Sequence, residues 1–304
     1  MDLSILVISW NTADMTLACL ASVFERLGGL EAEVIVVDNA SDDDTVARIE
    51  AKFPQVRLIR NAENRGFAAA NNQAIAVARG RHVLLLNSDT LVRGEVLPAS
   101  VAFLDGHDDV GAMGCRVLNT DGTVQDNNIH FPTLPRMVSG LVGLRKLGLH
   151  RPDPARQAEV DVVAGCYLMV RRDVIEAVGG LDEAFFFFGE ETDWCRRMRA
   201  AGWRVVYAPV GEITHHGGGS VKRLNDRRDV MLSEATVRLQ RKYNGLPGGL
   251  AAFALIFAFN ASRAAFWSLL APLSRQGRAR ARAAHFRAVT AQTGATWPRL
   301  RGDA

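Results

Sequence analysis

The chain has 304 residues, of which 48% are hydrophobic and 23% are charged. This composition excludes a disordered or low-complexity chain, and the length suits one large α/β domain with a smaller extension. The formal net charge is +3, but its parts differ in sign: acids dominate residues 31–63. The end of the chain is instead rich in arginine, including Arg275, Arg278, Arg280, Arg282 and Arg287.

The cysteines and the first residues both bear on the compartment. Four cysteines are scattered along the chain without a CxxC pair, and isolated thiols of this kind usually pack as small buried hydrophobes. Met1 is followed at once by Asp2 and a strand-like run, without the basic and apolar regions of a secretory signal. We therefore expect a reducing, cytoplasmic environment.

The first third of the chain alternates strand and helix patterns. Apolar, β-branched runs predict strands at 3–9, 34–37, 56–60 and 83–86, and apolar residues at helical spacing predict helices at 14–27, 45–52 and 68–78. Such alternation predicts a doubly wound, mostly parallel sheet with helices on both faces. The fold class expected from the pattern is therefore α/β.

Polar residues follow three of these strands directly. Asn11 follows the first strand, Asp38 the second, and Asn87-Ser88-Asp89 the fourth. In open α/β sheets, ligands bind just outside the carboxyl ends of the strands. Asp89 is thus positioned to meet a hard cation or a ribose hydroxyl, and we expect Asn11, Asp38 and Asp89 to lie at one edge.

The middle of the chain is less regular. We predict a strand at 110–117, a turn at 119–122, an irregular segment at 131–154, and a strand at 160–171. A short helix is predicted at 173–178, a longer one at 190–201, and extended structure from 203 to 207, ahead of His215-His216.

A second cluster of chemical interest combines aromatic and acidic residues. Four phenylalanines, Phe185 to Phe188, precede Glu190 and Glu191 at the start of the predicted helix. Apolar surroundings raise the pKa of a carboxyl group toward the range of a general base, whereas a helix N-terminus favours the ionised form. The two effects oppose each other, so the pattern leaves the protonation state open.

The last seventy residues differ from the rest. Residues 250–273 are mostly apolar but are interrupted by Asn260, Ser262 and Arg263, and the basic tail follows. Because a central arginine costs about 3 kcal/mol on insertion scales, we favour a helix lying in the membrane interface. A spanning helix, or one packed on the rest of the chain, remains an alternative. The expected division is 1–235 and a helical extension, 236–304.

Taken in order, the motifs resemble family 2 glycosyltransferases, and particularly the rhamnosyltransferase-like branch that builds surface polysaccharides. The resemblance extends from about residue 3 to 220. It rests on Val7-Ile8-Ser9-Trp10-Asn11, Val36-Val37-Asp38-Asn39-Ala40-Ser41, Asn64-Arg65-Gly66-Phe67-Ala68, Leu86-Asn87-Ser88-Asp89, Gly180-Leu181-Asp182-Glu183 and Glu190-Glu191. It implies the GT-A fold and inverting, metal-dependent transfer from a nucleoside diphosphate sugar.

The resemblance also implies roles for individual residues. Those expected to bind the nucleotide sugar are Ser9, Asn11, Asp38, Asn64, Gly66, Asn71, Asn87, Ser88 and Asp89. Asp89 and His215 would hold Mg²⁺ or Mn²⁺ on the diphosphate, and Glu191 would be the catalytic base with Glu190 beside it. Two positions depart from the family's pattern. The metal motif begins with Asn87 where many relatives have an acid, and Glu191 stands where relatives often have aspartate.

Competing interpretations follow from the same residues. Taken singly, an acid after a strand is commonly a helix cap or a turn former. A non-catalytic nucleotide-sugar-binding protein or membrane scaffold could keep Asp38 and Asp89 without needing a base. A dinucleotide-dependent oxidoreductase is disfavoured because no G-x-G-x-x-G follows the first strand.

The expected partners and location follow from the leading interpretation. The partners are a nucleoside diphosphate sugar, a glycan or lipid-linked acceptor, and a membrane surface, with no nucleic acid. The expected location is the cytoplasmic face of the cell membrane. The expected process is the biosynthesis of cell-envelope polysaccharide.

Overall fold

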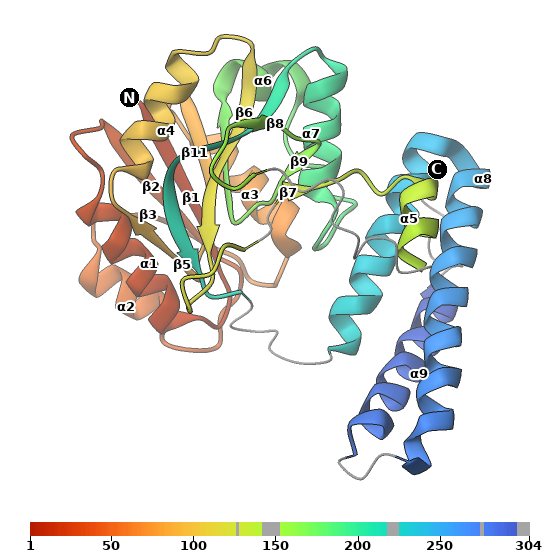
Figure 1. Cartoon of the computed structure of the whole chain (residues 1–304). Coiled ribbons are helices and arrows are strands. Elements are labelled where there is room, and N and C mark those ends of the chain that lie inside the picture. Colours follow the sequence, from red (N-terminus) through yellow and green to blue (C-terminus); the bar gives the residue numbers. More distant parts are fainter. Residues whose placement is uncertain (126–127, 142–152, 218–224, 274–276, 297–304) are drawn as a thin grey trace. The chain divides into compact units, whose positions relative to one another are not determined.

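The computed structural model describes residues 1–125, 128–141, 153–217, 225–273 and 277–296 (Figure 1). The chain forms two compact units. The first consists of Met1–Phe131, Pro152–Phe186 and Glu190–Gly219, and the second of Pro132–Arg151, Phe187–Gly189 and Ser220–Ala304. The boundary expected after residue 235 falls inside helix α8 (Asp226–Leu270), all of which belongs to the second unit.

The first unit alternates strands and helices through its first third, as the pattern predicts. Its strands are β1 (Leu3–Ser9), β2 (Ala32–Asp38), β3 (Arg57–Arg60), β4 (His82–Asn87), β5 (Thr90–Arg93), β6 (Val110–Leu118), β7 (Asn128–Ile129), β8 (Ala158–Glu159), β9 (Val162–Val163), β10 (Tyr167–Arg171) and β11 (Arg204–His215). Its helices are α1 (Ala13–Glu25), α2 (Thr45–Lys52), α3 (Gly66–Val77), α4 (Val96–Asp105), α6 (Arg172–Val178) and α7 (Glu190–Ala200).

One sheet organises this unit, with the strand order β3-β2-β1-β4-β10-β6-β11-β5, and β8 pairs with β11. Strands β1 to β4 are parallel, as predicted. Strand β10 then runs antiparallel between β4 and β6, and β5 is antiparallel to β11 at the edge. The sheet is therefore mixed, and its parallel half brings the carboxyl ends of β1, β2 and β4 together.

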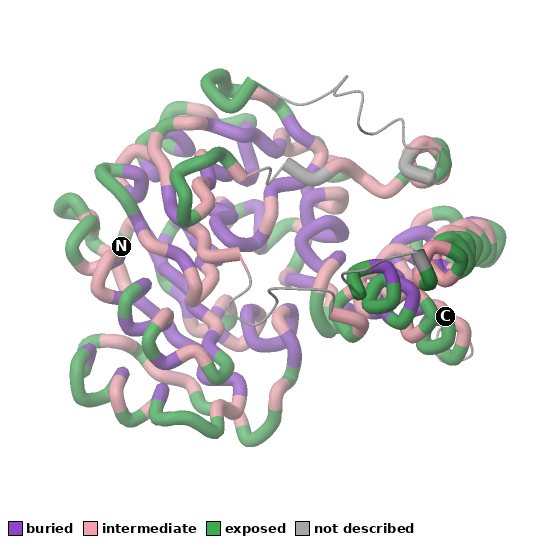
Figure 2. The backbone as a smooth tube through the Cα atoms, turned by 60° about the horizontal axis from the view of Figure 1, so that its bottom comes forward, coloured by how far each residue is buried: buried purple, intermediate pink, exposed green. Residues whose placement is uncertain are grey.

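Alternating side chains of the central strands form two apolar layers. Leu3, Ile5 and Val7 of β1 face α1, α2 and α4, whereas Leu6 faces α3, α6 and α7. Figure 2 shows the strands of this unit as buried and the outer helix surfaces as exposed. Burying both faces explains why the strands read as continuous apolar runs in the sequence.

Three local predictions need correction. The strand expected at 160–171 is two strands, because β9 pairs with β7 in a separate two-stranded sheet and β10 joins the main sheet. Strand β5 and helix α4 follow Asp89 where no element was predicted. The segment expected to be irregular contains helix α5 (Leu134–Leu141), and its residues 142–152 lie outside the described part.

The second unit is helical. Besides α5 and α8 it contains α9 (Arg278–Thr296), and α8 and α9 pack side by side (Figure 1). Helix α8 has a kink at Asn244 and Gly245, two residues before Pro247. Val237, which precedes the kink, packs in one apolar cluster with Ala252, which follows it. Leu134 and Met137 of α5 pack against this cluster.

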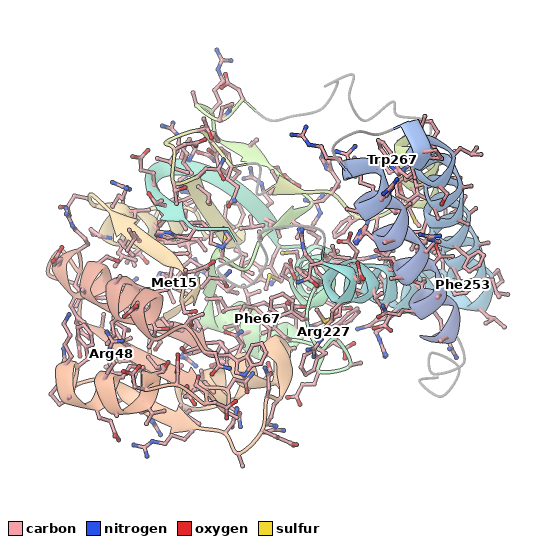
Figure 3. All side chains as sticks on the ribbon, turned by 90° about the horizontal axis from the view of Figure 1, so that it is seen from below. Met15, Arg48, Phe67, Arg227, Phe253 and Trp267 are labelled. Carbon is pink, nitrogen blue, oxygen red and sulfur yellow. The ribbon has the colours of Figure 1, made fainter. Side chains whose placement is uncertain are left out.

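Two polar contacts tie α9 to α8. His285 is buried on α9, and its two ring nitrogens face the carboxylates of Asp226 and Asp229 at the start of α8. The guanidinium of Arg282 lies 4.5 Å from the ring centre of Trp267, which Figure 3 labels on α8. Both contacts hold the first half of α9 against α8, one at the start of α8 and the other near its end.

Much of the α8 surface is apolar and exposed. Leu246, Leu250 and Phe257 are spaced by four and seven residues, which places them on one side of the helix. Phe266 and Leu269 are exposed near its end, Leu269 with 78% of its surface accessible. By length and composition alone, α8 is long and apolar enough to cross a membrane.

Candidate functional site

The tips of three neighbouring strands carry the predicted polar residues. In the register of the sheet, Ser9 of β1 stands beside Asp38 of β2, and Ile8 stands beside Asn87 of β4. The backbone N–H of Asn39 also donates to the carbonyl of Ser9 over 2.8 Å. The sequence prediction that residues near 11, 38 and 89 share one edge of the sheet agrees with this arrangement.

Asp38 is a buried carboxylate with an unused oxygen. Its side chain is 3% exposed, and Oδ2 accepts a hydrogen bond from the backbone N–H of Ser41 over 3.0 Å. Oδ1 is buried without a hydrogen-bond partner among the described residues. An unmet buried acceptor costs about 1–3 kcal/mol. Asp38 therefore offers an acceptor for a ligand's N–H or O–H.

Asn71 on α3 shows the same pattern. Its Nδ2 donates to the carbonyl of Phe67 over 2.9 Å, whereas its Oδ1 is buried without a partner among the described residues. Phe67, labelled in Figure 3, lies at the start of α3. Asn71 thus adds a second unused acceptor from the helix that follows β3.

Asn39 organises the loops around this edge, although the sequence analysis gave it no role of its own. Its Nδ2 donates to Oδ1 of Asn64 and to the carbonyl of Gly66, while its Oδ1 accepts from Asn61 and from the backbone of Arg65. Asn64 is therefore engaged in holding the turn before α3. The sequence signal for Asn39 was its place directly after Asp38.

Gly66 permits a close approach, but the approaching group belongs to the protein. Gly66 has φ +81°, and a Cβ there would stand 2.4 Å from the carbonyl oxygen of Phe186. The same carbonyl accepts the backbone N–H of Phe67 over 2.8 Å. The glycine we expected beside the nucleotide thus lets the loop that precedes α7 dock on α3.

The motif Gly180-Leu181-Asp182-Glu183 docks on α3 as well. Asn72 donates from Nδ2 to the carbonyl of Leu181, and its Oδ1 accepts the backbone N–H of Leu181. A Cβ at Gly180 would stand 2.4 Å from Asn72 Oδ1. Asn72, which the sequence analysis did not single out, therefore positions the chain that leads to Glu190 and Glu191.

Ser9 and Asn11 are both used within the protein. Ser9 is fully buried, and its hydroxyl lies 2.8 Å from that of Thr16 on α1. Asn11, at φ +52°, accepts the backbone N–H of Asp42 on Oδ1 and donates its own to the Ser41 hydroxyl. These contacts join the loops after β1 and β2 around Asp38.

Asp89 and His215 face each other at the far end of the same edge. Nε2 of His215 lies 3.2 Å from Oδ1 of Asp89, and both side chains are largely buried. The amide of Asn87 is 3.4 Å from the same ring nitrogen, and Ser88 contacts Thr12 through its hydroxyl. The next backbone N–H, of His216, donates to the carbonyl of Asp89. Strand pairing sets this approach, since His215 stands opposite Thr90.

Glu190 and Glu191 occupy the first turn of α7, as predicted, and are 3% and 9% exposed. Asp193 is fully buried and pairs with Arg197 over 2.8 Å, so it serves the packing of α7. Of the phenylalanines expected to form a dry wall, Phe185 is buried but Phe186 is 45% exposed. The carboxylates are buried, therefore, with less aromatic cover than the sequence suggested.

The pKa of one buried thiol depends on both acidic positions, Asp89 and Glu191. Cys166 is buried just before β10, and its carbonyl accepts the backbone N–H of Asn87 over 3.3 Å. Burial, followed by the negative charges of Asp89 and Glu191, raises the pKa of the Cys166 thiol to about 12. The two acids that contribute to this raised pKa are 102 positions apart in the chain.

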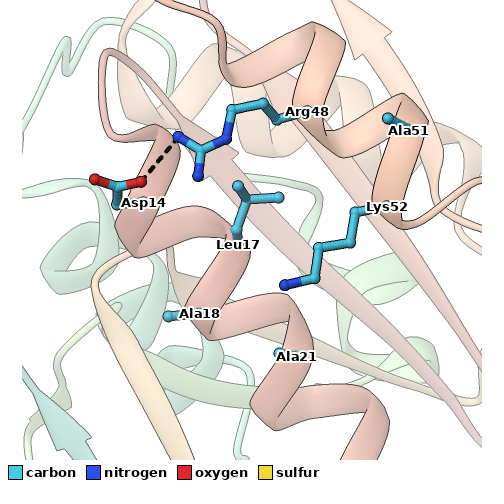
Figure 4. Close-up of a pocket in the computed structure, with 7 residues that line it drawn as sticks. All are labelled: Asp14, Leu17, Ala18, Ala21, Arg48, Ala51 and Lys52. Carbon is cyan, nitrogen blue, oxygen red and sulfur yellow. Dashed lines mark ion pairs between the residues drawn. The ribbon is translucent and has the colours of Figure 1, made fainter.

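Within the described residues, no group of three or more His, Cys, Asp and Glu side chains is arranged to hold a metal ion. A surface hollow of about 430 Å³ lies between α1 and α2, lined in part by Asp14, Arg48 and Lys52 (Figure 4). None of its lining residues is among the candidate site residues.

Comparison with known proteins identifies the family. Residues 4–179 match the model of glycosyl transferase family 2. The chain is 29% identical over 226 residues to N-acetylglucosaminyl-diphospho-decaprenol L-rhamnosyltransferase of Mycobacterium tuberculosis (strain H37Rv), covering 68% of this chain and 72% of that one. It is 30% identical to uncharacterized protein y4gI of Sinorhizobium fredii, over 75% of this chain but 26% of that protein's length.

A solved structure shares the fold. The mannosyltransferase PcManGT from Pyrobaculum calidifontis, in complex with GDP-Man and Mn²⁺, superposes with a TM-score of 0.59 at 19% identity. The match covers 97% of this chain and 87% of that one. The first unit accordingly has the GT-A-like α/β fold that the motifs implied. The family model covers more than half of the residues, and the chain therefore belongs to glycosyl transferase family 2.

Proposed function

We propose that this protein is an inverting glycosyltransferase that moves a sugar from a nucleoside diphosphate sugar to a hydroxyl group of a lipid-linked or polysaccharide acceptor. One observation carries the proposal: in a chain of glycosyl transferase family 2, the Asp89 carboxylate and the His215 imidazole lie 3.2 Å apart after β4, and Glu191 is buried on the first turn of α7. These residues offer one carboxylate for the diphosphate side and one for the acceptor side.

The nucleotide side of the site is the sheet edge around Asp38. The unused oxygens of Asp38 and Asn71 are acceptors for ribose hydroxyls or for an N–H of the base. Asn39 and Asn64 keep the surrounding loops in place, and Gly66 keeps the loop that carries Phe186 close to α3. In this proposal Ser9 and Asn11 contribute by holding the loops after β1 and β2 in place around Asp38.

Asp89 and His215 are the proposed ligands of Mg²⁺ or Mn²⁺. A carboxylate and an imidazole 3.2 Å apart form a donor set suited to such an ion. Because Mg²⁺ is commonly bound by one or two carboxylates together with substrate phosphates, the diphosphate would supply further ligands. When bound, the ion stabilises the negative charge of the leaving diphosphate.

Glu191 is the proposed base. As the acceptor oxygen forms its bond to the anomeric carbon, the bond to the diphosphate breaks and the hydroxyl proton passes to the Glu191 carboxylate. The burial of Glu191 excludes water from that carboxylate, and Glu190 lies beside it on the first turn of α7. A single base with attack from the face opposite the leaving group gives inversion.

The donor and acceptor are suggested by the mycobacterial relative, whose name states transfer of L-rhamnose to a diphospho-decaprenol acceptor. Together with the rhamnosyltransferase-like motifs, this supports a deoxythymidine-diphosphate rhamnose donor and an acceptor presented at a membrane. The proposed location is the cytoplasmic face of the cell membrane.

The helical part from about residue 236 is the proposed membrane contact. Residues 236–304 carry eleven arginine and lysine residues and one acid, Asp303. Arg278, Arg280 and Arg287 are exposed on α9, and Leu250 and Phe257 are exposed on α8. Exposed apolar side chains beside cations are the pattern of helices that lie in an anionic membrane interface.

The test is release of nucleoside diphosphate from a panel of donor sugars, with Mg²⁺ or Mn²⁺ and a lipid extract as acceptor. We expect Glu191→Gln to lower turnover about 10²–10⁴-fold while nucleotide binding is retained. Glu176→Gln, on the exposed face of α6, is the matched control and should leave turnover unchanged. Full turnover in Glu191→Gln would show that Glu191 is not the base. Nucleotide binding without transfer to any acceptor would favour a non-catalytic nucleotide-sugar-binding protein.

A further inference from the structure

His215 has different neighbours on its two ring nitrogens. Nδ1 lies 2.7 Å from Oε1 of Gln125, and Nε2 lies 3.2 Å from Oδ1 of Asp89. A neutral imidazole carries one N–H and one bare nitrogen, and the bare nitrogen must point toward any metal that it binds. The role of His215 therefore depends on which nitrogen holds the proton.

The orientation of the Gln125 amide follows from a chain of hydrogen bonds. Its Nε2 donates to Oδ1 of Asn119 over 3.2 Å, and Nδ2 of Asn119 donates to the Thr123 hydroxyl over 2.9 Å. That hydroxyl in turn donates to Oδ1 of Asp121 over 2.6 Å. Each link joins one donor to one acceptor.

The carboxylate at the outer end sets the direction of the whole chain. An ionised carboxyl group can only accept, and hydrogen bonds from Thr123 lower the pKa of Asp121. The Thr123 hydroxyl must therefore donate to Asp121, so the Asn119 NH₂ donates to Thr123 and its oxygen accepts from Gln125. Oε1 of Gln125 then remains as the acceptor that faces Nδ1 of His215.

A closed hairpin turn holds this chain in place. The backbone N–H of Asn119 donates to the carbonyl of Thr123, that of Gly122 to Asn119, and that of Gln125 to Val117. Leu118 at the end of β6 also stands beside Thr214 of β11 in the sheet. Because the hairpin continues from β6, strand pairing carries Gln125 to the side of His215.

We propose that Gln125 is a positioning residue that holds His215 as the Nδ1–H tautomer and so turns the lone pair of Nε2 toward a divalent cation shared with Asp89. This inference rests on the proposed function, because it takes Asp89 and His215 as the metal ligands. Gln125 acts through His215 and itself touches neither substrate nor metal.

The experiment compares Gln125→Leu and Gln125→Met, which remove the acceptor, with Gln125→Glu, which keeps it. The full chain is titrated with Mn²⁺ alone, followed by electron paramagnetic resonance. The tautomer of His215 is read from long-range ¹H–¹⁵N spectra without metal, at a pH where the ring is neutral. Both readouts are independent of turnover.

We expect Mn²⁺ affinity to fall roughly 10- to 100-fold in Gln125→Leu and Gln125→Met, as for other partners of metal-bound histidines. In both variants the Nδ1–H form should no longer be the main tautomer of His215. Gln125→Glu should keep the Mn²⁺ affinity and the tautomer of the parent. Unchanged affinity and tautomer in whichever of the first two variants folds would overturn the inference.

The result separates this inference from the proposed function. If Asp89→Asn abolishes Mn²⁺ binding but the Gln125 variants bind as the parent does, Gln125 has no positioning role and the metal site stands. If Asp89→Asn and His215→Ala both bind Mn²⁺ as the parent does, the metal site itself is wrong, and the inference falls with it.

Discussion

In the first unit, carboxylates and amides are buried at the tips of strands and at the start of α7, whereas the second unit combines exposed large apolar side chains with exposed arginines. Asp38, Glu190 and Glu191 are all buried in the first unit. Phe266 and Leu269 of α8 are more than half exposed in the second. Each unit thus departs from the usual arrangement of polar outside and apolar inside, but in opposite directions.

The charge of the two regions differs as well. After residue 235 the chain has eleven cations and one acid, so the first 235 residues carry 25 cations and 32 acids. An acidic region suits a site that works through carboxylates and a bound cation, and a basic, apolar region suits an anionic lipid surface. The two regions therefore suit the different tasks proposed for them, sugar transfer in the first and membrane attachment in the second.

The largest expected effect concerns the buried carboxylate Asp193. Arg197→Met leaves this fully buried group without its 2.8 Å ion pair, so the free energy of unfolding should fall by about 3 kcal/mol. Arg199→Met on the same helix breaks the more exposed pair with Glu159 and should cost no more than about 1 kcal/mol. Denaturant unfolding measures both, and equal losses would show that burial does not distinguish these pairs.

The second prediction tests attachment. Replacing Arg278, Arg280 and Arg287 by glutamate leaves Arg282 on Trp267 and removes three exposed cations. At about 1 kcal/mol each, binding to vesicles containing anionic lipid should weaken more than 100-fold. Nucleotide binding should be unchanged. Co-sedimentation measures the effect, and undiminished vesicle binding would contradict the assignment of the second unit to the membrane.

The third prediction separates backbone strain from close packing. Gly66 and Gly179 have φ of +81° and +78°, but a Cβ would meet the Phe186 carbonyl at Gly66 and no atom within 4 Å at Gly179. Gly179→Ala should cost about 1–2 kcal/mol of unfolding free energy from strain. Gly66→Ala should cost about 1–3 kcal/mol more and should lower turnover. Similar losses from thermal unfolding would show that the Phe186 loop adjusts freely.

The smallest expected effect is a pH dependence. Burial lowers the pKa of His82, which lies 2.9 Å from Asp105 and next to Arg81. Below a pH of about 6.5 the unfolded chain binds a proton that the folded histidine resists, so stability should fall as the pH drops from there. The difference in melting temperature between pH 7.5 and 5.5 should be smaller in His82→Gln. An unchanged difference would assign the pH dependence to other groups.

The sequence predicted the strand tips well because their signal is local. An apolar run followed at once by Asp38 or by Asn87-Ser88-Asp89 marks both the buried strand and its polar end. The family motifs added Glu191 and His215. The approach of His215 to Asp89 depends on the pairing of β11 with β5. That pairing is long-range and has no local signature.

What the sequence missed depends on contacts between distant segments. Asn39, Asn72 and Gln125 act through hydrogen bonds to residues 22 to 109 positions away. The break between β9 and β10 was hidden because both are apolar and adjacent, although they belong to different sheets. The contact of Gly66 with the Phe186 carbonyl had no sequence signal either, because a glycine in a motif does not reveal which backbone approaches it.

Asp89 and Glu191 are proposed to serve opposite sides of one reaction site. The most direct test is a crystal structure with Mn²⁺ and a nucleoside diphosphate, in which anomalous scattering locates the metal. We predict a Mn²⁺ peak bound by Asp89 and His215, with the diphosphate on that ion and the Glu191 carboxylate facing it across an open space for the sugar. A Mn²⁺ peak away from Asp89, or a diphosphate bound where Glu191 cannot face it, would contradict the account.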